Sequence, residues 1–253
     1  MKAIVFSRDR AMQLDLLLTS LEKNAPGVFQ PTVIWYAKRD DYQHGYEICA
    51  EEHPDARFLR EDGLTYQVRS LMLGPEHVTF FTDDDVLYRT TTALPAILAE
   101  WICFSLRLGT NTTNCYPHGR PQELPMSLTW KWERGDGDFG YPMSLDGHVF
   151  RAQDLLPILN THNFSNPNWL EETLMRRAKE IGRPLMACFH ESHVVGIPAN
   201  RVNETTPNRN GETYPYPVQD LNERYLRGER IDLDALDFSD IRGAHQEIPL
   251  VFK

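Results

Sequence analysis

Residues 77–89 read HVTFFTDDDVLYR, a β-branched and aromatic run that leads into three consecutive carboxylates. Such a run is typical of a buried strand. Because side chains alternate along an extended chain, Asp83 and Asp85 are predicted to face one way and Asp84 the other. Carboxylates on one side of a strand end suit a hard divalent cation that also takes phosphate oxygens. The alternative is a solvated acidic turn that closes the strand.

The chain before this stretch alternates short apolar runs with amphipathic segments. Strands are predicted at 3–6, 32–37 and 56–60, and helices at 12–21, 42–52 and 66–73. The first helix takes Asp9 as its expected N-cap. This alternation favours a mostly parallel sheet, whose ligands lie beyond the carboxyl ends of the strands. Ser7, Arg8 and Arg10 follow the first strand, so they are expected either to touch a ligand or to form a solvated turn.

The chain after this stretch is less regular. A helix is predicted over 91–101, with Pro95 in its first turn, and a half-buried strand at 104–108. The loop at 111–140 is long enough to suggest a functional role. Its Trp130 and Trp132 are expected to pack in the core rather than form a shelf for a sugar. Further strands are predicted at 143–150 and 184–189, helices at 153–159, 166–181 and 218–226, a mobile loop at 200–217 and an extended, packed tail at 248–252.

Length, charge, cysteine spacing and the lengths of apolar runs exclude several classes of protein. The chain has 253 residues, 41% of them hydrophobic, which is enough for one large α/β domain or two small ones. The sequence contains no internal repeat and no linker, so one domain is expected. Its formal net charge of −10 argues against a nucleic-acid binder. The four cysteines are scattered without a C-x-x-C pair, so their spacing predicts neither a zinc site nor a disulfide framework. No apolar run matches a signal peptide or a membrane span, and a soluble, reduced, cytoplasmic protein is expected.

Four motifs occur in a characteristic order: IVFSRDR at 4–10, TFFTDDD at 79–85, WLEE at 169–172, and a histidine-bearing segment after the last core strand. Together they span roughly residues 3–195, and their order and spacing resemble glycosyltransferases of the GT-A fold, in the company of the family 2-like and fringe-like enzymes. The resemblance implies an α/β fold: a single GT-A-like domain over 1–253, with a mostly parallel central sheet flanked by helices and a C-terminal extension. The nucleotide-binding half would be about 1–110, the acceptor and catalytic half about 111–200, and the mobile loop and extension 201–253.

The same resemblance implies an activity. A sugar would pass from a nucleoside-diphosphate sugar, with UDP favoured by family frequency, to a hydroxyl of a glycan, a lipid-linked intermediate or a protein. The transfer would invert the anomeric centre, use Mn²⁺ or Mg²⁺ to neutralise the leaving group, and need one carboxylate as base. The loop at 200–217 would close over the donor and exclude water.

Residue roles follow from the resemblance position by position. The metal ligands would be Asp85, Asp83 (or Asp83 on the ribose) and His193, with His190 as a substitute. The nucleotide would contact Ser7, Arg8, Arg10, Asp83 and Asp84, with Tyr36, Gln67 and Arg69 near its base. The base would be Glu172, with Glu171 beside it. The family usually has Glu-Asp here, so the Glu-Glu pair leaves the identity of the base open, and both glutamates also fit simple compensation of a helix dipole.

Two other classes of protein remain. A metal-dependent nucleotidyltransferase or phosphohydrolase would share the carboxylates, but the loop at 7–10 lacks the glycines and lysine of sugar nucleotidyltransferases. A phosphohydrolase with an aspartate nucleophile would place it after the first strand, where Asp9 lies far into the loop. A non-catalytic protein that binds nucleotide sugars would keep the carboxylate pocket and tolerate loss of Glu172.

Overall fold

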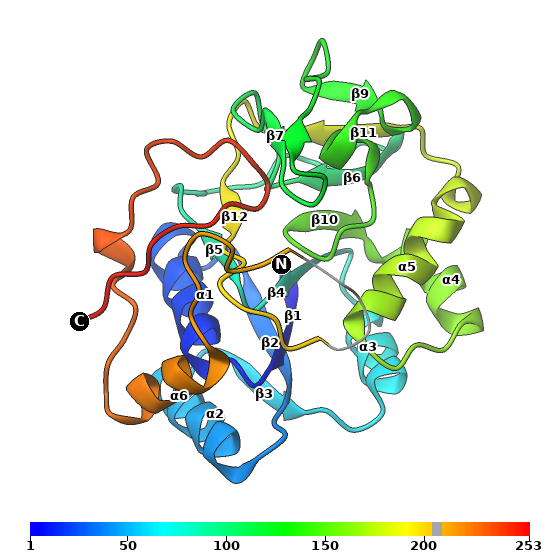
Figure 1. Cartoon of the computed structure of the whole chain (residues 1–253). Helices are drawn as coiled ribbons and strands as arrows, with labels where there is room; N and C mark the ends of the chain where they lie inside the picture. The colour runs from blue at the N-terminus through cyan, green and yellow to red at the C-terminus, as the bar shows by residue number, and fades with distance from the viewer. Residues whose placement is uncertain (204–208) are drawn as a thin grey trace.

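The computed structural model describes residues 1–203 and 209–253, and its centre is an eight-stranded sheet in the order β3-β2-β1-β4-β10-β6-β11-β9 (Figure 1). The strands are β1 (Lys2–Arg8), β2 (Gln30–Tyr36), β3 (Arg57–Arg60), β4 (His77–Thr82), β6 (Trp101–Ser105), β9 (Thr129–Lys131), β10 (His148–Arg151) and β11 (Leu185–Cys188). The first four run parallel, β10 is antiparallel to both β4 and β6, and β11 is parallel to β6. The predicted α/β fold with a mostly parallel sheet is confirmed.

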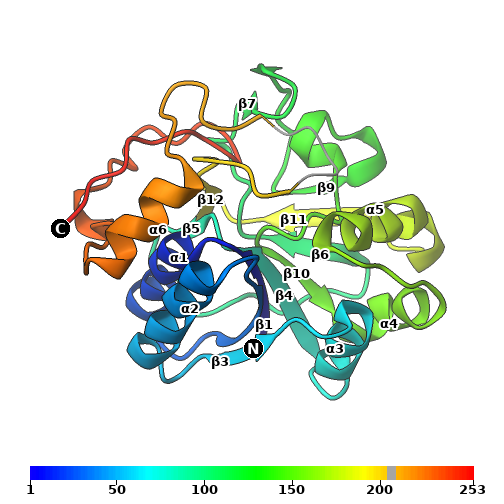
Figure 2. The same cartoon turned by 60° about the horizontal axis from the view of Figure 1, so that its bottom comes forward.

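Helices cover both faces of the sheet (Figure 2). One face carries α1 (Ala11–Asn24), α2 (Asp40–Glu52) and α6 (Val218–Leu226), and the other carries α3 (Leu64–Met72), α4 (Ala152–Thr161) and α5 (Pro167–Arg177). In β1, Ala3 and Val5 belong to the apolar cluster under the first group, whereas Ile4 and Phe6 belong to the cluster under the second. The strand is apolar throughout because both of its faces are buried.

Two smaller sheets complete the architecture. Strand β5 (Asp85–Leu87) pairs antiparallel with β12 (Val194–Gly196), and β7 (Asn114–Cys115) pairs with β8 (Arg120–Pro121). Four 3₁₀ helices are described: η1 (Trp132–Arg134), η2 (Gly137–Gly140), η3 (Ala178–Ile181) and η4 (Leu233–Ala235). The chain therefore leaves the main sheet after β4, turns through Asp83 and Asp84, and enters a second sheet at Asp85.

The helix predicted at 91–101 is wrong. Residues 90–100 are irregular, and Trp101 begins β6. The carbonyl of Ala99 accepts a hydrogen bond from Arg151 Nη2 (2.9 Å) and another from Arg183. The amide of Thr91 donates to the carbonyl of Asn24 at 2.7 Å. These groups are satisfied by distant parts of the chain instead of by a helix.

Two smaller predictions also need correction. Asp9 is not the N-cap of α1, because Arg10 occupies that position. Asp9 instead adopts a left-handed backbone conformation, with φ of 57°, and its Oδ1 accepts a hydrogen bond from the amide of Lys38 (2.7 Å). The strand predicted as half-buried at 104–108 ends at Ser105, and its last four residues are fully buried. Strand β6 lies between β10 and β11, so neither of its edges is free.

Other predictions are confirmed. Trp130 and Trp132 are buried, and their indole N–H groups donate to the carbonyls of Phe139 and Arg183. In the C-terminal tail Ile248 and Leu250 are buried. Of the loop predicted to be mobile, 204–208 lie outside the described residues. Among the helices of the described chain, none has the length and apolar character needed to cross a membrane.

Candidate active site

A cavity of about 750 Å³ opens beyond the carboxyl ends of β1 and β4. Strands β2 and β3 lie on one side of β1 and β4 lies on the other, so the sheet reverses its winding direction between β1 and β4. This reversal is where open α/β sheets bind ligands. The cavity walls come from the loops after β1 and β4, from 115–118 and 137–146, from the start of α5, from 198–203 and 209–210, and from His245.

Asp83 connects the two central strands. Its carboxylate accepts hydrogen bonds from Ser7 Oγ (2.8 Å), the amide of Arg8 (3.1 Å) and Arg10 Nη1 (2.9 Å). Burial raises the pKa of Asp83 to about 6, although Arg10 opposes the shift. Arg10 Nη1 also lies 3.2 Å from Asp84 Oδ2. Both oxygens of Asp83 are therefore committed to donors of the protein itself.

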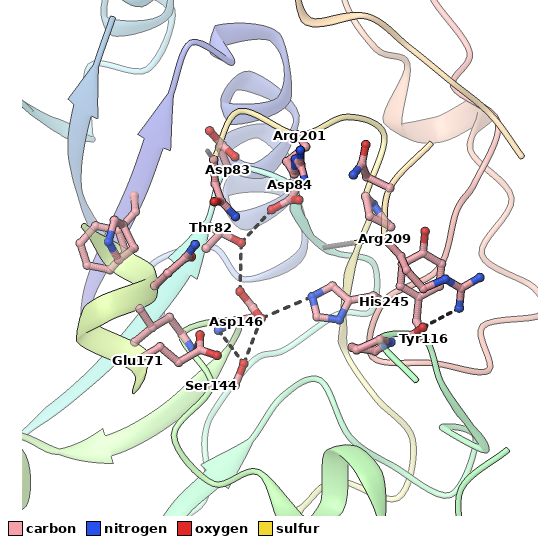
Figure 3. A pocket seen from close by; sticks show the side chains of 18 of the residues that line it. Thr82, Asp83, Asp84, Tyr116, Ser144, Asp146, Glu171, Arg201, Arg209 and His245 are labelled. Atoms are coloured by element: carbon pink, nitrogen blue, oxygen red, sulfur yellow. Dashed lines mark hydrogen bonds and ion pairs between the residues drawn. The ribbon is translucent and has the colours of Figure 1, made fainter. Parts of the chain in front are cut away.

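Asp84 and Asp146 meet across a single hydroxyl (Figure 3). Thr82 Oγ1 lies 2.8 Å from Asp84 Oδ1 and 3.0 Å from Asp146 Oδ1. A hydroxyl has one proton, so it donates to only one of these carboxylates at a time. The other face of Asp146 contacts Arg107 Nη1 (2.7 Å) and His245 Nε2 (3.4 Å). Burial alone would raise the pKa of Asp146, but His245 and Arg107 hold it below its usual value.

Glu171 lines the same cavity from α5 and lies near Asp146 (Figure 3). Helix α5 begins at Pro167, and the Asn166 side chain caps it by accepting the amide of Trp169 (2.9 Å). Glu171 Oε2 accepts the amide of Leu145 (3.2 Å), and its carboxylate also hydrogen-bonds with Tyr141. Burial, and then the negative charge of Asp146, raise the pKa of Glu171 to about 7.

Glu172 has different surroundings. It also lines the cavity, but its side chain is 53% exposed and pairs with Arg176, one turn along α5. An exposed pair of this kind contributes little to stability. Of the two glutamates, Glu171 therefore has the environment of a group that exchanges protons near neutral pH.

The structure brings seven of the predicted site residues together. The cavity is lined by Ser7, Arg8, Arg10, Asp83, Asp84, Glu171 and Glu172. Tyr36, Gln67 and Arg69, predicted near the nucleotide base, do not line it. Tyr36 lies under the Arg8 guanidinium, with 5.2 Å from ring centre to Cζ. Gln67 donates to the carbonyl of Arg60 and ties α3 to the end of β3, whereas Arg69 donates to that of Leu159 and ties α3 to α4.

Of the predicted metal ligands Asp83, Asp85 and His193, Asp83 alone lines the cavity, so the three are not assembled there. The predicted alternation is wrong because the chain turns at Asp83 and Asp84 instead of continuing as a strand. Asp85 is buried behind that turn, and its Oδ2 accepts the amide of Thr82 (2.9 Å). The Nδ1 of His193 lies 2.7 Å from Thr91 Oγ1, and its ring stacks on Phe189. Neither Asp85 nor His193, nor the substitute His190, lines the cavity.

Several residues that line the cavity lie outside the sequence motifs and were not predicted. They are Arg107, Tyr116, Tyr141, Asp146, Arg201, Arg209 and His245. Asp146 was inside a segment predicted as strand, where the Asp-Gly pair at 146–147 is a turn signal. No local pattern marks His245, whose contact with Asp146 joins positions about 100 residues apart. A Cβ on Gly196 would lie 2.4 Å from the ring of His245, so the absence of a side chain there makes room for it.

Known proteins give an independent comparison. No protein-family model matches the sequence. The bifunctional glycosyltransferase pgtA of Dictyostelium discoideum is 22% identical over 279 residues, and the match covers 93% of this chain and 34% of that protein. The chain thus spans about a third of the length of this curated relative.

Solved structures give weaker likenesses. TarS of S. aureus matches with a TM-score of 0.48 and 16% identity, over 76% of this chain and 36% of TarS. The bifunctional glycosyltransferase WbbM matches with a TM-score of 0.40 and 12% identity, over 74% of this chain and 38% of WbbM. The similarity in sequence to pgtA is therefore the comparison that supports an assignment. This chain is similar, along almost its whole length, to part of a glycosyltransferase, which confirms the resemblance that its motifs predict.

Proposed function

We propose that the chain transfers a sugar from a nucleoside-diphosphate sugar, UDP being the favoured nucleotide, to an acceptor hydroxyl in this cavity. The observation that carries the proposal is that two sets of groups line one cavity. The carboxyl end of β1 meets Asp83 and Asp84 where the sheet reverses, and Glu171, with a pKa of about 7, lines the same cavity from α5. The similarity to the glycosyltransferase pgtA supports this assignment.

The donor is expected to lie along the loop after β1. Arg8 and Arg10 line this side of the cavity, and Arg201 and Arg209 line it from the loop after β12. Guanidinium groups suit diphosphate oxygens because their N–H donors match two oxygens at once. Arg10 is held in place by Asp83 and Asp84, so its position is set before a ligand arrives.

A divalent cation fits the donor atoms at Asp84. Asp84 Oδ1 and Asp146 Oδ1 share the one proton of the Thr82 hydroxyl, so one of these two oxygens does not receive it, and His245 adds an imidazole. Hard oxygen ligands suit Mn²⁺ or Mg²⁺. We propose that Asp84 holds the cation, with Asp146 and His245 beside it; when bound, the cation would neutralise charge on the leaving diphosphate. In the structure the ligand atoms of Asp84, Asp146 and His245 do not all lie within 4.8 Å of one another. Among the described residues, three ligand atoms come that close only in a different cluster, which is treated below.

Glu171 is the proposed base. The acceptor oxygen forms a bond to the anomeric carbon while its proton passes to the Glu171 carboxylate. The bond from that carbon to the diphosphate breaks, and the nucleoside diphosphate leaves with the electron pair. Attack from the side opposite the leaving group inverts the anomeric centre. A base with a pKa near the working pH is efficient because it is largely ionised yet still accepts a proton.

The hydrolase alternative is not favoured. A phosphohydrolase with an aspartate nucleophile after β1 would need Asp9 in the cavity. Asp9 is buried, its Oδ1 is held by the amide of Lys38, and it does not line the cavity.

Thermal unfolding tests the donor site. The chain is heated with UDP, GDP, dTDP, CMP or ADP, each with and without Mn²⁺. A nucleotide at a hundred times its dissociation constant adds about 2.7 kcal/mol, which raises Tm by roughly 5–10 °C in a protein of this size. We expect one nucleotide to give a shift that requires the metal, is lost in Asp84→Asn, and persists in the exposed control Asp55→Asn. No shift with any nucleotide would refute the donor site.

A further inference from the structure

A second cluster of ligand-bearing side chains lies outside the cavity, between α1 and α2. It consists of Asp15 in α1, Cys49 in α2, and His53 directly after α2. An oxygen of Asp15, the sulfur of Cys49 and a ring nitrogen of His53 lie within 4.8 Å of one another. All three side chains are buried, with exposed fractions of 6%, 0% and 3%. None of the three lines the cavity.

The spacing of these atoms suits a small tetrahedral ion. Cys49 and His53 are four residues apart, so they lie on the same side of α2. The Nε2 of His53 lies 2.9 Å from Asp15 Oδ1. Ligand atoms around tetrahedral zinc are about 3.3–3.8 Å apart, as follows from bond lengths of 2.0–2.3 Å. A side-chain rotation that separates Nε2 and Oδ1 by a further few tenths of an ångström would let both atoms bind the same ion.

Glu22 supplies an independent sign of metal binding. Its Oε1 lies 2.7 Å from the other ring nitrogen of His53, Nδ1. Histidines that bind a metal usually donate their second N–H to a carboxylate, which fixes the ring and its tautomer. Without a metal, His53 needs protons on both nitrogens to satisfy Asp15 and Glu22. With a metal on Nε2, the neutral ring satisfies both.

We propose that Asp15, Cys49 and His53 bind one Zn²⁺ ion, with Glu22 orienting His53. A thiolate and an imidazole select zinc over the hard cations expected at Asp84. The charge of Zn²⁺ is balanced by the two negative charges of the Asp15 carboxylate and the Cys49 thiolate, and the neutral imidazole of His53 adds no charge. Tyr225 of α6 hydrogen-bonds with Cys49 and also donates to Glu52 (3.1 Å), so α6 covers the site. The ion would join α1 to α2 under α6.

The ion would stabilise the fold. The site lies between two helices on one face of the sheet, and zinc bound only to the folded chain stabilises that chain. The three protein ligands leave the fourth position of the tetrahedral ion to a water molecule. The spacing of cysteines along the sequence did not predict this zinc site. The site has only one thiol, Cys49, and the carboxylate of Asp15 comes from a different helix. The proposal does not rest on the function proposed above.

Metal reconstitution tests the proposal on the full chain. The protein is stripped with a chelator, and Zn²⁺ is returned while bound metal is counted. We expect one tightly held zinc per chain. With Co²⁺ in its place, we expect a thiolate-to-cobalt charge-transfer band that is absent in Cys49→Ser and present in Cys115→Ser. The latter is the matched control, because Cys115 also lies near a histidine, His118.

Variants of exposed residues guard against failure to fold. Glu22 is half-exposed, so Glu22→Gln should fold, and we expect its zinc affinity to fall about 10–100-fold. Glu51→Gln, on the exposed side of α2, should bind as the parent does. Asp84→Asn should keep the zinc, which separates this site from the cavity. A stripped chain that takes up no zinc, or a charge-transfer band that survives Cys49→Ser, would show that the cluster is a hydrogen-bonded network only.

Discussion

Glu171 and Glu172 are neighbours on α5, yet their side chains meet different surroundings. Glu171 receives the amide of Leu145 and lies near Asp146, whereas Glu172 extends to Arg176. The sequence motif predicts a base at this pair, but it gives no means to choose between two identical side chains. The choice comes from burial and from charges contributed by a loop about 25 residues earlier in the chain.

Replacing each glutamate by glutamine separates their roles. We expect Glu171→Gln to lower kcat by about 10²–10⁴-fold, the usual contribution of a general base. Glu172→Gln should change kcat less than about threefold, because it removes only an exposed ion pair. Steady-state transfer assays on both variants check this. Equal losses, or the larger loss in Glu172→Gln, would assign the base to Glu172.

The pH dependence of the same residue gives a second test. With a pKa of about 7, Glu171 is protonated and inactive as a base at lower pH. We expect kcat/KM to rise with pH through about 7 and then level off. Its carboxyl binds a proton more tightly in the folded chain than in the unfolded one, where the pKa is 4.5. Its contribution to folding stability therefore falls as pH rises from about 4.5 to 7.

Glu171→Gln should remove this penalty. At pH 8 we expect the variant to melt at a higher temperature than the parent although it transfers sugar more slowly. Thermal unfolding at pH 5 and pH 8 measures the difference, with Glu172→Gln as the matched control. A variant that is equally destabilised at both pH values would contradict a raised pKa at Glu171.

Elements of the first half of the chain follow from local patterns. The strands and helices up to β4 alternate as the apolar periodicity predicts, because each βα unit is built from residues close in sequence. Prediction of secondary structure and burial fails where contacts with distant parts of the chain determine them. Residues 90–100 carry helix-forming residues, but Arg151 and Arg183 take the Ala99 carbonyl. The buried character of β6 likewise depends on β10 and β11, which come later in the chain.

Helix α5 holds both glutamates, so its N-cap is a useful place for mutation. Asn166→Ala removes the acceptor for the Trp169 amide and should cost about 1 kcal/mol. We expect Tm to fall by roughly 2–4 °C. Asn166→Asp keeps the oxygen and adds a charge that suits a helix N-terminus, so it should restore Tm. An unchanged Tm in Asn166→Ala would show that tertiary packing alone fixes the start of α5.

The cavity as a whole draws on chain segments from both ends of the sequence. Ser7, Arg8 and Arg10 were predicted as part of it from their place after a buried strand, and Asp83 and Asp84 from the family resemblance. Asp146 and His245 were not, because nothing local distinguishes them. Their role depends on Gly196, which leaves space for the His245 ring, and on Arg107, which follows β6 and binds Asp146.

Glu247 holds the segment at 212–214 against the C-terminal tail. Its two oxygens accept the amides of Glu212, Thr213 and Tyr214, and Oε1 also accepts the hydroxyl of Tyr116. Hydrogen bonds to a charged group each contribute about 1.5–3 kcal/mol when buried, and less at this partly exposed site. This single carboxylate therefore ties the loop after β12 to the tail.

Glu247→Ala should loosen that loop. We expect trypsin to cut after Arg209 about tenfold faster, since a loss of about 1.4 kcal/mol raises the open population tenfold. Glu229→Ala, which removes a partly exposed acid paired with Arg224 and Arg227, is the control and should leave the cut rate unchanged. Equal rates in the parent and Glu247→Ala would mean that other contacts hold the segment.

The position of His245 has a consequence for biosynthesis. About 160 residues separate Asp84 from His245, which at 5–20 residues per second is roughly 8–32 s of translation. Throughout that interval the nascent chain carries the first carboxylates without the histidine that lies against Asp146. A nascent chain therefore holds most of the residues of this pocket well before it can form the pocket, and the wall is complete only once His245 has been added.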